Sequence, residues 1–251
     1  MLTIERQDEI LELLKEKSPL SVKKLADKLF VSEATIRRDL AELEKQSLVR
    51  RTHGGAILLQ KESEETGLNF RMSELTKEKE KIAKLAMPLI KNAKALFLDS
   101  SSTVAIMAKH IDTQFATIVT TGINTALNVS QEENRTVILL GGVVSFSLNS
   151  VCGSITENQI ADFNFETAIL SCAGIDGNFF ATEKTLQQCA VKKQVLKRAK
   201  TKILLVDNTK FNAGNMFKIC SVEDFDYIVT DKNPPDEFLD FIKDKKVKVS
   251  Y

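Results

Sequence analysis

The chain contains few of the residues that build metal centres and disulfide frameworks. Its 251 residues include four widely spaced cysteines, without a CxxC pair, and two histidines. These residues are Cys152, Cys172, Cys189, Cys220, His53 and His110. Structural zinc sites need closely spaced ligands of these types, and disulfide scaffolds need a dense cysteine framework. We therefore expect no metal site, no disulfide framework and no cofactor.

Long apolar runs are also missing. No stretch is apolar enough to span a bilayer, and no basic segment followed by an apolar one opens the chain. We therefore expect a cytoplasmic protein without a membrane partner. Hydrophobic residues make up 43% and charged residues 27%, which is typical of a packed globular chain. The net charge of +1 is small, so recognition of nucleic acid must depend on where charges lie.

The segment 31–55 predicts a helix followed by a basic hairpin. Ser32 is suited to cap the helix because its hydroxyl accepts from the free amides of the first turn. An apolar stripe at helical spacing is formed by Ile36, Leu40 and Leu43. The opposite face carries Ala34, Thr35, Arg38 and Ala41, with Arg37 on the flank. Small residues followed by a forked guanidinium suit a helix that approaches DNA base edges.

The neighbouring segments favour this function over a plain surface helix. Any amphipathic helix can carry two arginines, so the helix alone decides nothing. Upstream, Ser21 is suited to cap a second short helix. Downstream, residues 48–57 alternate polar and apolar side chains around Gly54-Gly55, as a hairpin wing does. Between residues 37 and 51, five basic side chains stand against three acidic ones, which is a modest local surplus.

Two motifs carry a resemblance to a known family. The runs Thr35-Ile36-Arg37-Arg38-Asp39-Leu40 and Arg51-Thr52-His53-Gly54-Gly55 resemble the winged helix-turn-helix of the DeoR family of bacterial transcriptional regulators. The resemblance implies binding to double-stranded operator DNA. The DNA-contacting residues that we predict are Ser32, Thr35, Arg37, Arg38, Arg51 and His53.

The chain divides into two predicted domains. A first helix, capped by Thr3 and stopped by Pro19, completes the DNA-binding domain at residues 1–57. Its apolar face comprises Ile4, Ile10, Leu11, Leu13 and Leu14. Residues 58–75 are mostly polar and acidic, so we expect a linker whose first residues could instead extend the wing. Residues 76–251 form the second domain.

The second domain alternates helices and short apolar strands. Thr76 is suited to cap its first helix. We expect strands at residues 95–98, 117–119, 137–140, 168–170, 203–206, 227–229 and 247–249. Continuous apolar strands between helices predict an α/β fold with a mostly parallel sheet that is covered on both faces.

Small and polar residues follow several of these strands. In such sheets the ligand lies beyond the carboxyl ends of the strands, and hydroxyls at a helix N-terminus favour a phosphate. Each feature alone is weak, because a Ser-Thr run usually caps a helix and a strand-end Asp often bonds its own loop. Together they predict a pocket for a small phosphorylated polyol. Its residues are Asp99, Ser101, Ser102, Thr103, Thr120, Thr121, Gly141, Gly142 and Lys210; the resemblance given next adds Asp176.

The second domain resembles the DeoR effector domain, which implies a fold like ribose-5-phosphate isomerase and the sensing of sugar phosphates. The matching residues are Asp99, Ser102, Thr103, Gly141-Gly142, Gly153, Asp176-Gly177 and Asp207-x-x-Lys210-Phe211. The chain departs from the family pattern at Ser101 (usually Gly), Thr121 (Asn), Phe180 (Gly) and Gln188 (Glu).

We therefore predict a repressor of sugar-metabolism genes that a phosphorylated sugar effector releases from DNA. One winged helix reads one half-site, so a homo-oligomer, either a dimer or a tetramer, is expected. Two alternatives stay open. A DNA-binding protein with a vestigial pocket is one. An isomerase is the other, and it could enlist Asp99, Asp176, Glu183 and Lys210, although Gln188 cannot act as a carboxylate base.

Overall fold

The computed structural model describes residues 2–16, 19–46, 48–52, 54–58, 67–113, 116–129 and 135–251. The chain forms two compact units, Met1–Glu74 and Leu75–Tyr251. Within the described ranges, no helix has the length and apolar character needed to cross a membrane.

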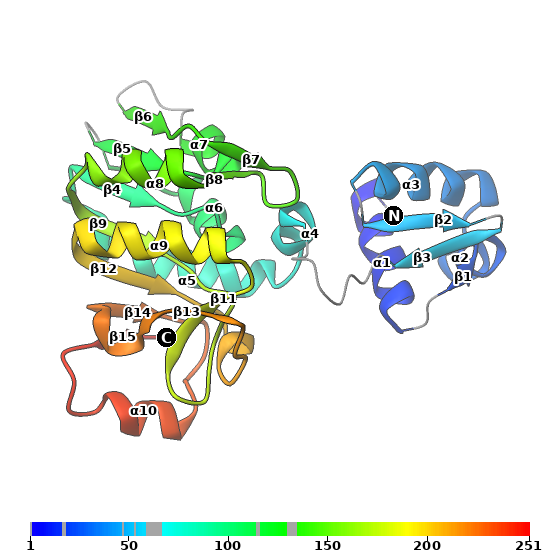
Figure 1. Cartoon of the computed structure of the whole chain (residues 1–251). Coiled ribbons are helices and arrows are strands. Elements are labelled where there is room, and N and C mark those ends of the chain that lie inside the picture. The colour runs from blue at the N-terminus through cyan, green and yellow to red at the C-terminus, as the bar shows by residue number, and fades with distance from the viewer. Residues whose placement is uncertain are drawn as a thin grey trace. The chain divides into compact units, whose positions relative to one another are not determined.

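The first unit is a winged helix-turn-helix (Figure 1). Its elements are α1 (Thr3–Glu16), β1 (Leu20–Ser21), α2 (Val22–Leu29), α3 (Glu33–Lys45), β2 (Val49–Thr52), β3 (Gly55–Leu58) and α4 (Leu68–Ser73). The three strands form an antiparallel sheet in the order β1-β3-β2, in which β2 and β3 are the predicted hairpin wing. The predicted helices, the caps Ser21 and Ser32, and the wing are confirmed.

Local chemistry explains these boundaries. The hydroxyls of Ser21 and Ser32 accept from the amides of Lys24 and Thr35, so each begins its helix. Phe30 ends α2 in the left-handed region, with φ of 54°. Gly55 is required where β3 crosses β1, because a Cβ there would lie 2.0 Å from the carbonyl oxygen of Leu20.

Four expectations for helix ends and faces were wrong. Thr3 is the first helical residue of α1, because the carbonyl of Leu2 already accepts from the amide of Arg6. Ile4 is 73% exposed, since six residues of helix turn it about 120° away from buried Ile10. Residues 68–73 of the expected linker are helical, with Leu68 and Phe70 buried. Thr76 likewise starts its helix, after Leu75 in the left-handed region without a side-chain cap.

The second unit is a seven-stranded parallel sheet with helices on both faces (Figure 1). The sheet order is β15-β14-β12-β9-β4-β5-β6. Its strands are β4 (Ala95–Leu98), β5 (Thr117–Thr120), β6 (Thr136–Leu139), β9 (Phe165–Leu170), β12 (Ala199–Leu205), β14 (Tyr227–Val229) and β15 (Lys248–Ser250). Every predicted strand is present, and all six pairings are parallel, which confirms the α/β class.

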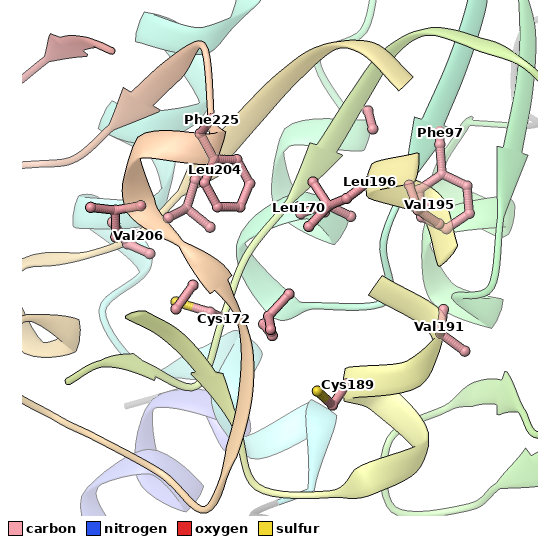
Figure 2. Close-up of a cluster of buried hydrophobic side chains, with 14 of the residues drawn as sticks. Phe97, Leu170, Cys172, Cys189, Val191, Val195, Leu196, Leu204, Val206 and Phe225 are labelled. Atoms are coloured by element: carbon pink, nitrogen blue, oxygen red, sulfur yellow. The ribbon is translucent and has the colours of Figure 1, made fainter. Parts of the chain in front are cut away.

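Two apolar cores lie on the two faces of this sheet, as the alternation of a strand requires. The helices of the unit are α5 (Thr76–Ile90), α6 (Ser102–Ala108), α7 (Ile123–Val129), α8 (Ser154–Ala161), α9 (Leu186–Arg198) and α10 (Asp236–Ile242). Leu96 and Leu98 pack against α5 and α6, whereas Phe97 packs against α9 in the other core. Figure 2 shows this second core, in which Val195 lies beside Phe97, Leu170 beside Leu196, and Leu204 beside Phe225.

Several short strands were not predicted. A hairpin joins β7 (Val143–Ser145) to β8 (Ser150–Cys152). A small antiparallel sheet joins β10 (Gly174–Ile175), β11 (Phe180–Glu183) and β13 (Phe217–Ser221). Two 3₁₀ turns complete the unit, η1 (Asn208–Lys210) and η2 (Val222–Asp224). Strands of two to five residues are too short for a periodic pattern to show.

The strand order creates one switch point. From central β4 the chain moves outward through β5 and β6, and it then returns to β9 on the other side of β4. The loops after β4 and β9 therefore leave the same edge of the sheet in opposite directions. This edge of the sheet is where an α/β fold of this kind binds ligands.

Candidate nucleic-acid interface and effector site

Helix α3 presents the predicted polar face. Ile36, Leu40 and Leu43 are buried in the core of the first unit. Arg37 and Arg38 are exposed and Thr35 is half-buried, on the side away from this core. In the described part of the chain, Arg38 forms no ion pair and no hydrogen bond through its side chain, so its guanidinium is available to a ligand.

An ion pair that the sequence did not reveal anchors α3. Asp39 is buried, and its carboxylate accepts from Arg6 Nε at 2.6 Å and from Arg6 Nη2 at 3.1 Å. The hydrogen bond that Arg6 donates to Asp39 raises the pKa of Arg6, although desolvation acts in the opposite direction. Asp39 thus does not offset the surface charge of the arginines, which leaves the exposed face of α3 more basic than the residue count suggested.

Two further arginines of the interface are paired with carboxylates. Arg37 Nη2 lies 2.6 Å from Glu33 Oε2, one helical turn away. Arg51 of the wing donates its backbone N–H to Glu44 at 2.8 Å and its Nε–H to the same carboxylate at 2.7 Å. These two bonds lower the pKa of Glu44, the backbone bond contributing most.

A groove of about 440 Å³ lies between α3 and the wing. Its lining residues are Val22, Arg37, Leu40, Glu44, Arg51, Thr52, Gly54 and Gly55. Ser32 serves α3 as its cap, and its hydroxyl also lies 2.9 Å from that of Thr35. His53 lies outside the described residues. The structure thus places two predicted arginines, Arg37 and Arg51, on one concave surface.

Some of the residues predicted for the effector site lie at the switch point. Asp99 follows β4 and is buried. One carboxylate oxygen accepts from the amide of Ser101, and the other accepts from the amide of Ser171 after β9, both at 2.8 Å. The Asp99 side chain therefore joins the two loops.

Lys192 lies beside Asp99 at the switch point, and the sequence analysis did not identify it. It is buried on α9, and its Nζ lies 2.5 Å from Glu183 Oε1 and 3.3 Å from Asp99 Oδ2. It also donates to the carbonyl of Ser171 at 2.7 Å. Burial lowers the pKa of Lys192, but the two carboxylates outweigh burial and raise the pKa overall. The sequence could have indicated it, because Lys192 falls in line with the mostly apolar residues that α9 buries.

One turn earlier on α9, Gln188 contacts the loop after β4. Its Oε1 accepts from the hydroxyl of Ser100 at 3.4 Å, and its Nε2 donates to the hydroxyl of Ser150 at 3.0 Å. All three residues are buried. A carboxylate in place of the amide could not donate to Ser150, so Gln188 joins the loop after β4 to the hairpin β7–β8 by neutral hydrogen bonds.

The loops after β4 and β5 pack closely. Ser101 caps α6, and Ser102 and Thr103 are buried behind it. Thr125 donates to the carbonyl of Asp99 at 3.1 Å, and a Cβ on Gly122 would lie 2.9 Å from the Cα of Ser100. Thr120 and Thr121 precede this glycine and are also buried.

Three residues predicted for the pocket, Gly141, Gly142 and Asp176, contact other parts of the α/β unit. Gly141 is held against α8, because its amide donates to Gln159 and its carbonyl accepts from Thr156. Neighbouring Gly142 has φ of 150°, and a Cβ there would clash with the Thr156 hydroxyl. The carboxylate of Asp176 closes the turn between β10 and β11 by accepting two backbone amides.

Lys210 stands at the end of β12, in η1, and is half-buried. The strand β12 that precedes this turn adjoins β9 on the side away from β4. Lys210 therefore lies in the loop after β12, and the hydroxyl residues lie in the loop after β4.

A winged helix-turn-helix with outward arginines, joined to an α/β unit whose polar groups gather at its switch point, defines a ligand-responsive DNA-binding regulator. The family model described as "DeoR-like helix-turn-helix domain" matches residues 6–62. The family model described as "DeoR C terminal sensor domain" matches residues 74–232. The chain belongs to the DeoR family of transcriptional regulators.

Relatives match over nearly full length. The HTH-type transcriptional regulator GolR of Listeria innocua is 34% identical, over 92% of this chain and 91% of GolR. The uncharacterized HTH-type transcriptional regulator YulB of Bacillus subtilis is 32% identical, over 100% and 97%. The glycerol-3-phosphate regulon repressor of Escherichia coli is 30% identical, over 98% and 97%. A solved D-ribose-5-phosphate isomerase aligns over 54% of each chain with a TM-score of 0.40 and 19% identity.

Proposed function

We propose that this regulator is a repressor of sugar or sugar-phosphate metabolism genes and that a phosphorylated sugar metabolite releases it from its operator. The names of its relatives support repression, since similar proteins include the glycerol-3-phosphate regulon repressor and the transcriptional repressor GlcR of Bacillus subtilis. As a regulator of bacterial genes, it would act in the cytoplasm.

The DNA contacts come from α3 and the wing. The N-terminus of α3 enters the major groove, where Thr35 and Arg38 face base edges. Arg37 and Arg51 line the groove beside the wing and contact phosphates, and Ser32 and His53 complete the interface. The observation that carries this proposal is the Arg38 guanidinium, which is exposed on α3 and has no partner in the described part of the chain.

The effector binds at the switch point between β4 and β9. The loop of Ser101, Ser102 and Thr103 with Thr120-Thr121 supplies hydroxyls and amides, and Lys210 supplies a cation for the phosphate. Asp99 acts indirectly, because its carboxylate already accepts from Ser101 and Ser171. Gly141-Gly142 and Asp176 shape the surrounding loops rather than the anion site.

The contacts of the carboxylates oppose an enzymatic role. An isomerase needs a free carboxylate base beside the substrate carbon. Both Glu183 and Asp99 are buried against Lys192, and Asp176 is bound to backbone amides. The three carboxylates that could serve as the base are therefore held by the protein itself, and we propose that the chain is not an enzyme.

Control of DNA binding requires at least two copies of the chain. One winged helix reads one half-site, so a dimer or tetramer spans repeated half-sites. The effector releases the DNA if it binds more tightly to the subunit arrangement that misplaces the recognition helices.

A mobility-shift titration with the duplex upstream of the gene and with a random duplex tests both parts. We expect tighter binding to the upstream duplex and its reversal by one member of a sugar-phosphate panel. Ser102→Ala and Lys210→Ala should bind DNA normally but ignore that effector. Calorimetry that shows wild-type metabolite affinity in both variants would place the effector elsewhere. No binding of any sugar phosphate would favour a vestigial pocket.

A further inference from the structure

One carboxylate of the recognition helix binds the wing directly. Glu44 lies on α3 and Arg51 on β2, seven residues later. One oxygen of Glu44 accepts the backbone N–H of Arg51, and the other accepts its Nε–H, at 2.8 and 2.7 Å. The two side chains are 37% and 49% exposed, so both reach the surface of the groove.

The way Arg51 is held leaves its outer end available. A guanidinium has donors on Nε and on two terminal amino groups in one rigid plane. Glu44 occupies the Nε edge. In the described part of the chain, no other side chain bonds to the terminal amino groups. That end carries two parallel N–H donors, which is the geometry that matches two phosphate oxygens.

We infer that Glu44 is a positioning residue that aims the Arg51 guanidinium at the operator backbone and thereby increases discrimination between operator and random duplex. The inference rests on the proposed DNA-binding function. An arginine held in place before binding loses less rotamer freedom in a tightly docked complex. A loose non-specific complex tolerates several directions of the side chain and gains less from the restraint.

The charge of Glu44 has a separate effect that must be removed from the comparison. A carboxylate near DNA repels phosphates in every complex and so lowers affinity for both duplexes. The positioning effect therefore appears in the ratio of operator to random affinity, not in either affinity alone. Restraint of one long side chain corresponds to roughly a two- to tenfold change in that ratio.

Glu42 provides a matched control on the same helix. It is exposed and, among the residues that the structure describes, is paired with Lys45 alone, three residues along α3 at 3.2 Å. Its loss therefore removes the same charge without changing the contact with the wing. We expect Glu44→Ala to lower the affinity ratio two- to tenfold and Glu42→Ala to leave it unchanged. In an Arg51→Ala background, Glu44→Ala should have no further effect on the ratio.

A titration without DNA provides a second readout. The carboxyl carbon signal of Glu44 should titrate below the ordinary pKa of 4.5 in the wild type. In Arg51→Ala this pKa should rise only part of the way toward 4.5, because the side-chain bond is lost and the backbone N–H of residue 51 remains. Equal effects of Glu42→Ala and Glu44→Ala, or an effect of Glu44→Ala that persists without Arg51, would overturn the positioning role. A wild-type protein with no operator preference would overturn the proposed function and this inference with it.

Discussion

Arg6 of α1 donates two hydrogen bonds, of 2.6 and 3.1 Å, to the carboxylate of Asp39 on α3, and these bonds join the recognition helix to the first helix of the unit. Both side chains are largely removed from water, at 11% and 2% exposed. The charge of Asp39, in the middle of α3, therefore stabilises the packing of the two helices, whereas neighbouring Arg38 is exposed.

Asp39→Ala should reduce the stability of the DNA-binding unit. The change leaves the Arg6 guanidinium without its partner, which costs about 2–3 kcal/mol in the free energy of unfolding. Denaturant unfolding with probes in each unit measures it. Glu42→Ala, an exposed acidic residue on the same helix, should change stability by less than about 0.5 kcal/mol. Equal stability of the two variants would show that the Arg6–Asp39 ion pair makes no net contribution to the free energy of unfolding.

Arg38→Ala should weaken operator binding by about 1–3 kcal/mol, because a bidentate pair with guanine is lost. The same change should affect random duplex much less. Lys45→Ala, which removes a 75% exposed cation from the far end of α3, serves as the control. Unchanged operator affinity of Arg38→Ala in a mobility shift would exclude Arg38 from sequence readout.

Arg51→Ala should reduce the salt dependence of operator binding. If Arg51 neutralises one phosphate, the slope of log K against log salt concentration falls in magnitude by about one unit. Binding isotherms at several ionic strengths measure this slope. A normal slope combined with altered base preference would instead assign Arg51 to base readout.

Lys192→Met should destabilise the α/β unit by about 3–5 kcal/mol, because Asp99 and Glu183 would remain buried without a counter-charge. Lys193→Met, at an exposed position next in sequence, should have little effect. Since the pKa of Lys192 is raised in the fold, its contribution is fully present below pH 10.5 and is lost as pH rises through the folded pKa. A variant as stable as wild type at pH 7 would disprove this role.

Cys172 is buried and Cys220 is half-buried, and both thiols should be unreactive in the native protein. Desolvation raises the pKa of Cys172 and of Cys220 to about 12, from 9.0. The thiolates are therefore scarce at pH 8, and iodoacetamide should modify these residues only after unfolding. The unfolded thiols ionise first, so their contribution to stability is lost between about pH 9 and 12. Rapid native alkylation of Cys172, found by peptide mass, would contradict the burial that Figure 2 shows.

The positions of most helices and strands could be predicted from the amino-acid sequence alone. The stripe of Ile36, Leu40 and Leu43 with its cap Ser32 specified the recognition helix, because helical period and capping depend on near neighbours. Seven apolar runs specified the seven parallel strands for the same reason. The ends of α1 and α5 were misplaced by a residue, since backbone bonds of Leu2 and Leu75 begin those helices without a side-chain signal.

The sequence by itself determined which helices and strands form, which faces are apolar, and that polar residues follow the central strands. Tertiary structure alone decided the strand order, which puts Asp99 against Ser171, 72 residues later. It also decided the pairings of Arg6 with Asp39 and of Lys192 with Glu183. Such contacts join residues that no periodic pattern relates, so only the packed topology determines which charge meets which partner.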